Sequence, residues 1–466
     1  MKKKVYYFTA LLLSVFFQQA VAQKIAAGLN HSLMLCSDST VWATGDNMYG
    51  QLGDTTYYFK TVPKKVFSLA KIIAVSAGGH HSVALHKDST VWVWGRNDDG
   101  QLGTENYNGT TFPVKVPFIK NAIAISAGDM FTLILRRDST VWAAGNNQYG
   151  QLGDSTFVSK NKFTKVKGLS GVVRIEAGGQ HAFAITANGT LYVWGRNQHG
   201  QIGDSTTINR FAPVKNNTIE NVIDVAGGYW HSLALTIDGK VYSFGYNNDG
   251  QLGFGNFLNC VFPKQVNTLG GVIISDVAAG YYHSMAVSGT GSLYAWGQNG
   301  DSQLGDGTTT PRDIPVLIAG VNNLQYTDGG HGHTLAKQTS GGVYSWGKGV
   351  NGQLGLAFTN TKQTPQQMMD LGNCSLVFSV TEEAFAEKNI TVYPNPANDL
   401  INIEWKENSI QLLVQIFTPE LRIVQENQIT KYNNQINLSE LPNGAYLLKA
   451  SDKFGFSKFQ KIIIAR

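Results

Sequence analysis

WGRNDDGQLG, residues Trp94–Gly103, is a ten-residue phrase of which a recognisable copy occurs seven times in the chain. The copies are 50 residues apart, except for one interval of 52. A period of this length is typical of proteins built from repeated structural units. The first glycines of the seven copies are Gly45, Gly95, Gly145, Gly195, Gly245, Gly297 and Gly347.

A second phrase, AGGHHSVAL at Ala77–Leu85, keeps the same register as the first. Its Gly78 lies 17 residues before Gly95, and the other six copies show the same spacing. We refer to this residue as the AG glycine of a unit. The seven AG glycines are Gly28, Gly78, Gly128, Gly178, Gly228, Gly280 and Gly330.

One unit contains short segments with a hydrophobic period of two, which is typical of β-strands. Residues 72–75, 81–85 and 90–94 are three such segments, and a fourth is expected near residues 63–67. Lys87-Asp88-Ser89 provides the turn chemistry of a hairpin between the second and third. Four short antiparallel strands per unit indicate a propeller blade, and closure into a ring protects the sheet edges. We therefore predict an all-β chain with a seven-bladed β-propeller over residues 23–380.

The phrases WGxNxxGQLG and AGxxHS, together with this period, resemble the RCC1 repeat (regulator of chromosome condensation). The resemblance implies the same seven-bladed propeller. Leu102 and its equivalents are expected to fill the gap between blades. Ser302 replaces a glycine of the first phrase and Gly349 replaces an asparagine, so we predict altered loops in blades six and seven.

Residues 1–22 have the pattern of a secretory signal peptide. Three lysines precede an apolar run over residues 5–17, and Ala20-Val21-Ala22 offers a cleavage site before Gln23. A membrane anchor is the alternative, but the run is shorter than the ~20 residues that a spanning helix needs. We therefore expect an exported protein without a membrane span after cleavage. Removal of the three lysines lowers the formal charge from +5 to +2, too little to predict a nucleic-acid partner.

The three cysteines, Cys36, Cys260 and Cys374, are an odd number for an oxidising compartment. At most one disulfide can form. The sequence leaves open whether Cys36 pairs with Cys374 where the first and last blades meet. It also leaves open whether one blade combines strands from both ends of the chain.

Histidines recur at one position of six units and could suggest a metal or catalytic site. A catalytic residue is needed once, whereas a residue repeated in nearly every blade is more simply a hydrogen-bonded packing element. We therefore predict no metal, no cofactor and no catalytic residue here, and expect the following Ser or Thr to be structural too. The position is occupied by His31, His81, Phe131, His181, His231, His283 and His333.

Turns such as Ser37–Trp42 faintly resemble the Asp-box of sialidase propellers, but the glycine between Asp and Thr is missing. Such boxes are structural turns in any case. Glycoside hydrolysis needs two carboxylates, or another nucleophile and acid, at one site. No linear pattern marks such a pair.

Functional differences between blades should lie in the two positions after each AG glycine, which vary most informatively. Blades five to seven carry aromatic residues there, and hairpin parity places these turns on the same face as the WGxNxxGQLG loops. We predict a ligand-binding rim for a protein or glycan; the alternative is that the rings only pack the channel mouth. The candidate residues are Tyr229, Trp230, Tyr281, Tyr282 and His331, with Asp129 as the one acid in its column.

A second aromatic group follows the GQLG phrases, and we expect part of it to belong to the outer strands. The group comprises Tyr57, Tyr58, Phe59, Tyr107, Phe112, Phe157, Phe163, Phe211, Phe257 and Phe262, with Lys60 and Lys160 between them.

The repeat pattern stops near residue 381, where a polar linker over residues 381–389 is expected. Residues 390–466 begin with ITVYPNPANDLINIEW and later contain NGAYLL. This tail resembles the type A C-terminal sorting domain of the type IX secretion system of Bacteroidetes, on the motif residues Pro394, Asn395, Pro396 and Gly444. We expect a small Ig-like β-sandwich that contacts the secretion machinery and directs the protein outside the cell or to the outer-membrane surface. An ordinary adhesive module is the alternative.

Two function classes remain. The first is a binding propeller, expected to be a monomer, that holds a protein or glycan through its variable loops. The second is a glycan-active enzyme, a hydrolase or lyase, that uses the central channel. Nucleotide exchange on a small GTPase, as in nuclear members of the resembled family, conflicts with the export signals.

Overall fold

The computed structural model describes residues 24–370, 372, 374–376, 390–405, 411–418, 423–430, 433–451 and 457–466. The predicted signal peptide (1–22) and linker (381–389) lie outside these residues. The chain forms two compact units, one ending at Cys374 and the other beginning at Ser375.

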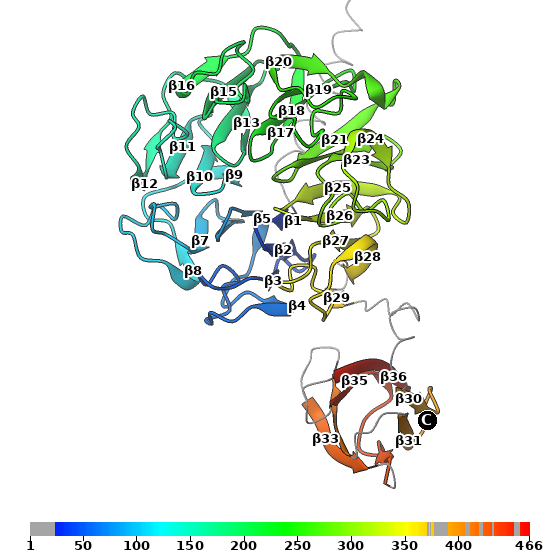
Figure 1. The fold of residues 1–466 in the computed structure, drawn as a ribbon. Helices are drawn as coiled ribbons and strands as arrows, with labels where there is room; N and C mark the ends of the chain where they lie inside the picture. The colour runs from blue at the N-terminus through cyan, green and yellow to red at the C-terminus, as the bar shows by residue number, and fades with distance from the viewer. Residues whose placement is uncertain are drawn as a thin grey trace, which may run out of the picture. The chain divides into compact units, whose positions relative to one another are not determined.

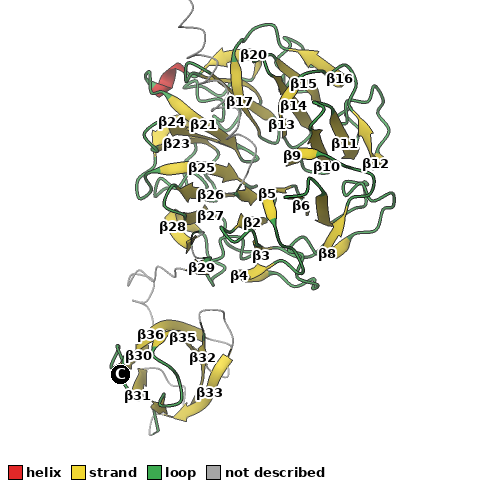
Figure 2. Cartoon of the chain, turned by 180° about the vertical axis from the view of Figure 1, so that it is seen from behind, coloured by secondary structure: helices red, strands yellow, loops and turns green. Residues whose placement is uncertain are grey.

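The first unit is a ring of seven antiparallel sheets, each built from strands that are consecutive in the sequence (Figure 1). The predicted all-β propeller is thereby confirmed. The first strand of each sheet lies nearest the centre of the ring and the last lies at the outer edge, as Figure 2 shows from the other side.

The first four blades have these strands: β1 (Ile25–Ala27), β2 (His31–Leu35), β3 (Val41–Gly45) and β4 (Lys60–Lys65); β5 (Ile72–Ala77), β6 (His81–His86), β7 (Val91–Gly95) and β8 (Thr110–Lys115); β9 (Ala122–Ala127), β10 (Phe131–Arg136), β11 (Val141–Gly145) and β12 (Lys160–Lys165); β13 (Val172–Ala177), β14 (His181–Thr186), β15 (Leu191–Gly195) and β16 (Arg210–Lys215). The last three have β17 (Val222–Gly227), β18 (His231–Thr236), β19 (Val241–Gly245) and β20 (Cys260–Gln265); β21 (Ile274–Ala279), β22 (His283–Ser288), β23 (Leu293–Gly297) and β24 (Arg312–Leu317); β25 (Leu324–Gly329), β26 (His333–Gln338), β27 (Gly342–Gly347), β28 (Lys362–Asp370) and the short β29 (Ser375–Leu376). The 3-10 turn η1 (Asn267–Leu269), red in Figure 2, precedes β21.

Each WGxNxxGQLG loop inserts between its own blade and the next. Leu52 is fully buried and packs in one cluster with Val75 and Trp94 of the second blade. The Trp94 indole N–H donates to the carbonyl oxygen of Gln51 at 2.8 Å. The predicted role of this leucine position, filling the gap between blades, is therefore confirmed.

The recurring histidines join neighbouring blades. His81 Nε2 lies 2.8 Å from the hydroxyl of Thr132, which itself donates to the carbonyl oxygen of Gln101. Because the hydroxyl has one proton and uses it on that carbonyl, it must accept from the imidazole. Burial lowers the pKa of His81 to about 3, so the ring is neutral with its proton on Nε2. The same bond links His31 to Ser82, His181 to Ser232, His231 to Ser284, His283 to Thr334 and His333 to Ser32. The prediction of structural histidines is confirmed.

At the interface between blades three and four, both members of this hydrogen bond are replaced. Phe131 replaces the histidine, and Ala182 of the fourth blade replaces the Ser or Thr that would have been its partner. The two side chains are fully buried in one apolar cluster with Trp194. The paired change leaves neither a donor nor an acceptor unsatisfied, so an apolar contact substitutes for the hydrogen bond at this position.

The ring closes without exchanging strands between its ends, because β1–β4 and β25–β29 form separate sheets. A disulfide between Cys36 and Cys374 joins the first blade to the segment that follows the last one. His333 Nε2 contacts the Ser32 hydroxyl at 3.0 Å across the same junction. Both questions that the sequence left open are answered: the cysteines pair, and no blade is mixed.

The loop of blade six is not altered as predicted. Ser302 adopts φ +60°, the left-handed conformation that glycine holds in the other blades. Its carbonyl accepts the Gly305 N–H at 3.1 Å, as the Gly250 carbonyl accepts the Gly253 N–H at 3.0 Å. In blade seven the same backbone bond runs from the Gly355 N–H to the Gly352 carbonyl at 3.0 Å, and the Gly352 N–H donates to the Gly349 carbonyl at 2.8 Å. That loop lacks only the asparagine side-chain bonds.

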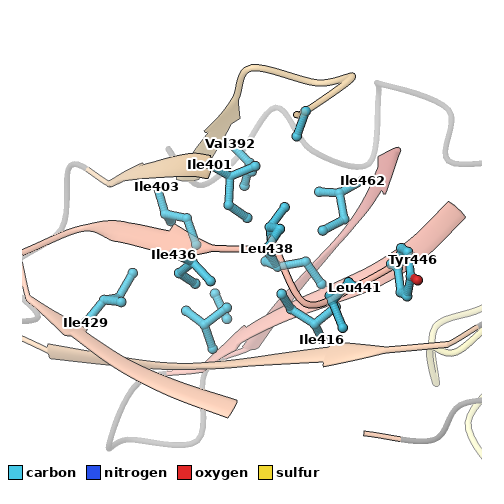
Figure 3. Close-up of a cluster of buried hydrophobic side chains, with 14 of the residues drawn as sticks. Val392, Ile401, Ile403, Ile416, Ile429, Ile436, Leu438, Leu441, Tyr446 and Ile462 are labelled. Carbon is cyan, nitrogen blue, oxygen red and sulfur yellow. The ribbon is translucent and has the colours of Figure 1, made fainter. Parts of the chain in front are cut away.

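The second unit contains two sheets that enclose an apolar core (Figure 3). The three-stranded sheet has the order β30 (Ile390–Tyr393), β31 (Leu400–Trp405), β34 (Gln435–Asn437), and the four-stranded sheet has the order β33 (Ile423–Thr430), β32 (Gln411–Phe417), β35 (Gly444–Ser451), β36 (Ser457–Ile464). Ile401, Ile436, Ile416 and Ile462 project between them. The predicted C-terminal β-sandwich is confirmed.

The disulfide predicts a measurable loss of stability on its removal. Because the bond joins residues 338 positions apart, Cys36→Ser and Cys374→Ser should each lower the free energy of unfolding by about 2–5 kcal/mol. Thermal melting of both variants checks this. Cys260→Ser is the control, and the denatured parent should titrate as one free thiol. Three thiols would contradict the pairing.

Because Phe131 and Ala182 are in contact, we expect substitutions at the two positions to have coupled effects on the free energy of unfolding. Phe131→His alone should cost about 1–3 kcal/mol because its buried Nε2–H would lack an acceptor. Adding Ala182→Ser should recover part of that loss by restoring the bond of the other blades. Urea denaturation of the singles and the double measures the coupling. A double variant less stable than Phe131→His would contradict this account.

Candidate functional site

The turns after the first strands and the long loops after the third strands lie on one face of the ring. In blade five the Tyr246 N–H donates to the Trp230 carbonyl at 2.9 Å, and blade one has the same bond from Asp46 to Asn30 at 2.8 Å. We call this the loop face. The prediction from hairpin parity is correct.

The aromatic residues after the AG glycines of blades five to seven touch one another on the loop face. Tyr229 stacks on Tyr281 with ring centroids 4.6 Å apart and an interplanar angle of 10°. Trp230 meets Tyr282 edge to face at 5.6 Å, and His331 meets Tyr281 in the same way at 5.2 Å. All five predicted rings are therefore contiguous. Each is partly exposed.

Asp129 joins this group from across the channel mouth, although it belongs to blade three. The Tyr281 hydroxyl donates to its Oδ1 at 2.8 Å. Burial raises the pKa of Asp129. A Cβ on Gly79 would lie 2.2 Å from Asp129 Oδ1, so the carboxylate needs glycine in the neighbouring blade.

Three further residues of the group, which the sequence pattern did not predict, come from the WGxNxxGQLG loops. Tyr246 and His199 pack against Trp230 with centroids 5.5 and 5.0 Å away. The Arg196 guanidinium lies over the Trp230 ring at 5.0 Å. Comparing these loop positions column by column would have found them. We call Tyr229, Trp230, Tyr246, Tyr281, Tyr282, His199 and His331 the aromatic cluster.

Polar atoms connect the cluster to its neighbours. Arg196 Nη1 donates to Gln180 Oε1 at 2.5 Å, and Gln180 Nε2 lies 3.4 Å from the Tyr229 hydroxyl. Burial raises the pKa of Tyr282 to about 12, so its phenol stays protonated and can donate. The surface thus offers apolar ring area beside a cation and hydroxyl donors.

The aromatics of the second predicted group lie apart from this cluster. Tyr58 is 76% exposed and Phe157 is 50% exposed. Phe157 contacts Phe211 of the next blade at 5.3 Å. Phe163 of β12 instead packs against the buried core between blades two and three, as expected for part of this group.

A cavity of about 60 Å³ lies on the axis below the loop face, with Glu176 and Asp328 in its wall. Burial raises the pKa of Glu176 to about 8 and that of Asp328 to about 7. Asp224, bound to Arg174 at 2.5 Å, and Asp276 also have pKa values raised by burial. The sequence pattern does not mark these acids, because they occupy alternate positions of innermost strands and become neighbours only through the curvature of the ring.

Within the residues that the structure describes, Cys36, Asp38 and Cys374 are the group with metal-ligand spacing. The two sulfurs are joined as a disulfide. A cysteine must be a thiolate to bind a metal ion, so the disulfide-bonded form of this group does not suit a metal.

The predicted sorting motif residues come together in the second unit. Asn395 Oδ1 accepts the Ile463 N–H at 2.8 Å, and the peptide bonds preceding Pro394 and Pro396 are cis. Asn443, which precedes Gly444 at the start of β35, exchanges hydrogen bonds with the backbone of Arg466 at 3.1 and 3.3 Å. The YPNP phrase and the NGAYLL phrase thus both bind the C-terminal segment.

The channel carboxyls predict an alkaline loss of stability. Glu176 and Asp328 have folded-state pKa values of about 8 and about 7 against ordinary values of 4.5 and 3.8. The folded state therefore retains protons that the unfolded chain has released, so stability falls as the pH rises through this range. Melting temperatures should fall between about pH 5 and about pH 9. The melting temperature of Glu176→Gln should exceed that of the parent at the alkaline end of this range and should equal it at the acid end. Glu220→Gln, on an exposed connector, is the control; parallel profiles for all three would contradict the assignment.

Family models match both units of the chain. The RCC1-like domain matches residues 108–392, and RCC1 repeats match residues 22–51, 38–85 and 72–101. The secretion system C-terminal sorting domain matches residues 391–465, which indicates export to the cell surface or beyond. Among the described residues, helices of membrane-spanning length and apolarity are absent. No curated protein sequence matches significantly.

Solved structures agree with the fold. Human WBSCR16 is 24% identical with a TM-score of 0.64, covering 70% of this chain and 92% of its own. Prp20p from Saccharomyces cerevisiae, described with its binding properties to Gsp1p and histones, is 23% identical with a TM-score of 0.66, covering 82% and 92%. The chain belongs to the RCC1-like domain family and ends in a secretion system C-terminal sorting domain.

Proposed function

We propose that this exported propeller is a binding module, and that the aromatic cluster on its loop face holds an extracellular protein or glycan. One observation carries the proposal. Seven partly exposed aromatic rings from blades four to seven form a continuous surface beside Arg196 and Asp129.

The chemistry of this surface suits recognition. Aromatic residues and arginine are the side chains that dominate binding hot spots, because they offer large apolar areas with a polar tip. Trp230 is in contact with Tyr246, Tyr282 and His199, so it is held in place before a ligand arrives. Preorganisation of this kind lowers the entropic cost of binding.

The channel offers less support for catalysis. The raised pKa values of Glu176 and Asp328 would suit a general acid of a glycan-active enzyme, which keeps that function as the second candidate. Their cavity of about 60 Å³, however, is far smaller than the ~300–1,000 Å³ of typical ligand pockets. A substrate would therefore have to react at the loop-face end of this cavity, which Asp129 also lines.

Binding of the purified chain to a glycan array and to surface-protein extracts tests the proposal. Trp230→Ala and Tyr282→Ala should each weaken binding by about tenfold or more, as expected when a central aromatic anchor is truncated. Both side chains are partly exposed, and melting temperatures verify that each variant remains folded.

Tyr58→Ala is the matched control, because Tyr58 is an exposed aromatic outside the cluster. Equal losses in Tyr58→Ala and Trp230→Ala would contradict a specific loop-face site. Turnover of a glycan that is abolished by Asp129→Asn would replace the binding module by the enzyme.

A further inference from the structure

The face opposite the loop face carries a concentrated positive charge on one side of the ring. This face consists of the turns between second and third strands and the connectors from each outermost strand to the next blade. Connectors 65–71, 115–121 and 165–171 with turns 36–39, 86–89 and 136–139 hold nine lysines and arginines and three acids. The equivalent segments of the other blades (186–189, 215–221, 236–239, 265–273, 288–291, 317–323 and 338–341) hold one lysine and two acids.

Backbone bonds join connectors 65–71 and 115–121 and turns 86–89 and 136–139, and connector 165–171 follows the outer strand of the blade that contains turn 136–139. The Lys87 N–H donates to the Lys71 carbonyl at 2.9 Å, and the Arg137 N–H donates to the Asn121 carbonyl at 2.8 Å. The Ala122 N–H reaches the Ser89 carbonyl at 3.1 Å, which connects the two pairs. We call this surface the basic edge. Its cations are Lys65, Lys71, Lys87, Lys115, Lys120, Arg136, Arg137, Lys165 and Lys167.

The three acids of the basic edge are already engaged. Asp38 accepts from the Thr40 hydroxyl at 2.6 Å. Asp88 accepts from the Thr90 hydroxyl at 2.6 Å and lies 2.7 Å from His86 Nδ1. Asp138 accepts from Thr140 at 2.6 Å and lies 3.7 Å from Arg136. In the described part of the chain no ion pair involves the lysines of the edge, all of which are exposed.

Two phenylalanines project from the same connectors. Phe118 is 84% exposed and Phe67 is 54% exposed. Phe118 also adopts φ +60°, at a position where the neighbouring connectors have Ser68 and Gly168 with φ +51° and +73°. A bulky residue in this left-handed conformation is strained relative to glycine. Folding therefore does not account for Phe118, either by burial or by backbone preference.

We propose that the basic edge docks on an anionic lipid surface, with Phe118 and Phe67 entering the apolar boundary and the lysines facing the headgroup phosphates. A soluble polyanion would pair with the lysines but would leave the phenylalanines in water. A bilayer satisfies both, since interfacial anchors combine aromatic side chains with Lys and Arg. The proposal is independent of the loop-face site, which lies on the other side of the ring.

The charge explains why docking should depend on salt. Each lysine near an anionic membrane contributes about a fivefold increase in partitioning, and this contribution decays within a Debye length. The full chain should therefore sediment with vesicles of 30% phosphatidylglycerol and 70% phosphatidylcholine at low salt. It should not sediment with pure phosphatidylcholine, and raising NaCl to about 0.5 M should release it.

Phe118→Gly separates docking from folding. Glycine accepts φ +60° without strain, so this variant should keep or raise the melting temperature while its partitioning falls by about tenfold or more. Lys115→Gln with Lys120→Gln should cost about twenty-fivefold. Ile273→Ala is the control, because Ile273 is 63% exposed on the connector before β21, where no lysine accompanies it.

Unchanged vesicle binding of Phe118→Gly would overturn the proposal, as would equal binding to pure phosphatidylcholine. Binding of the parent to heparin but not to anionic vesicles would also overturn it and assign the edge to a soluble polyanion.

Discussion

The contact on which the propeller depends is the hydrogen bond from each buried histidine to the hydroxyl of the next blade. It ties six of the seven interfaces together at the same depth, and the apolar Phe131–Ala182 pair occupies the seventh. Buried side chains of one blade pack against those of the next, as Leu52 of blade one does with Val75 and Trp94 of blade two. The core is therefore made between blades.

This geometry limits where the chain can vary. A Cβ on Gly78 would lie 2.2 Å from the Cε1 atom of His81 and 2.4 Å from the Gly128 carbonyl oxygen. The AG glycine, the histidine and the hydroxyl are thus coupled, and a change in one requires a change in its partner. The two residues between the AG glycine and the histidine lie in the turn on the loop face. They are free to differ from blade to blade, so Tyr229 and Trp230 can stand where Gly79 and His80 stand in another unit.

The ring also separates its chemistry in space. Aromatic side chains gather on the loop face of blades four to seven, whereas lysines gather on the opposite face of blades one to three. One rigid ring can therefore present two unlike surfaces without the electrostatics of one disturbing the other, and the sorting domain places both outside the cell.

The sequence alone determined the number of blades, the structural role of the histidines and the grouping of Tyr229, Trp230, Tyr281, Tyr282 and His331, because a strict 50-residue period assigns each residue a position in a known unit. Tertiary structure decided what meets across the ring. The Cys36–Cys374 bond, the approach of Asp129 to Tyr281, and the acids Glu176 and Asp328 in one cavity depend on closure and curvature, which no local pattern records. Ser302 is a second case that the sequence did not decide. The substitution of glycine predicted an altered loop, but the packed blades around the turn hold the Ser302 backbone in the glycine conformation.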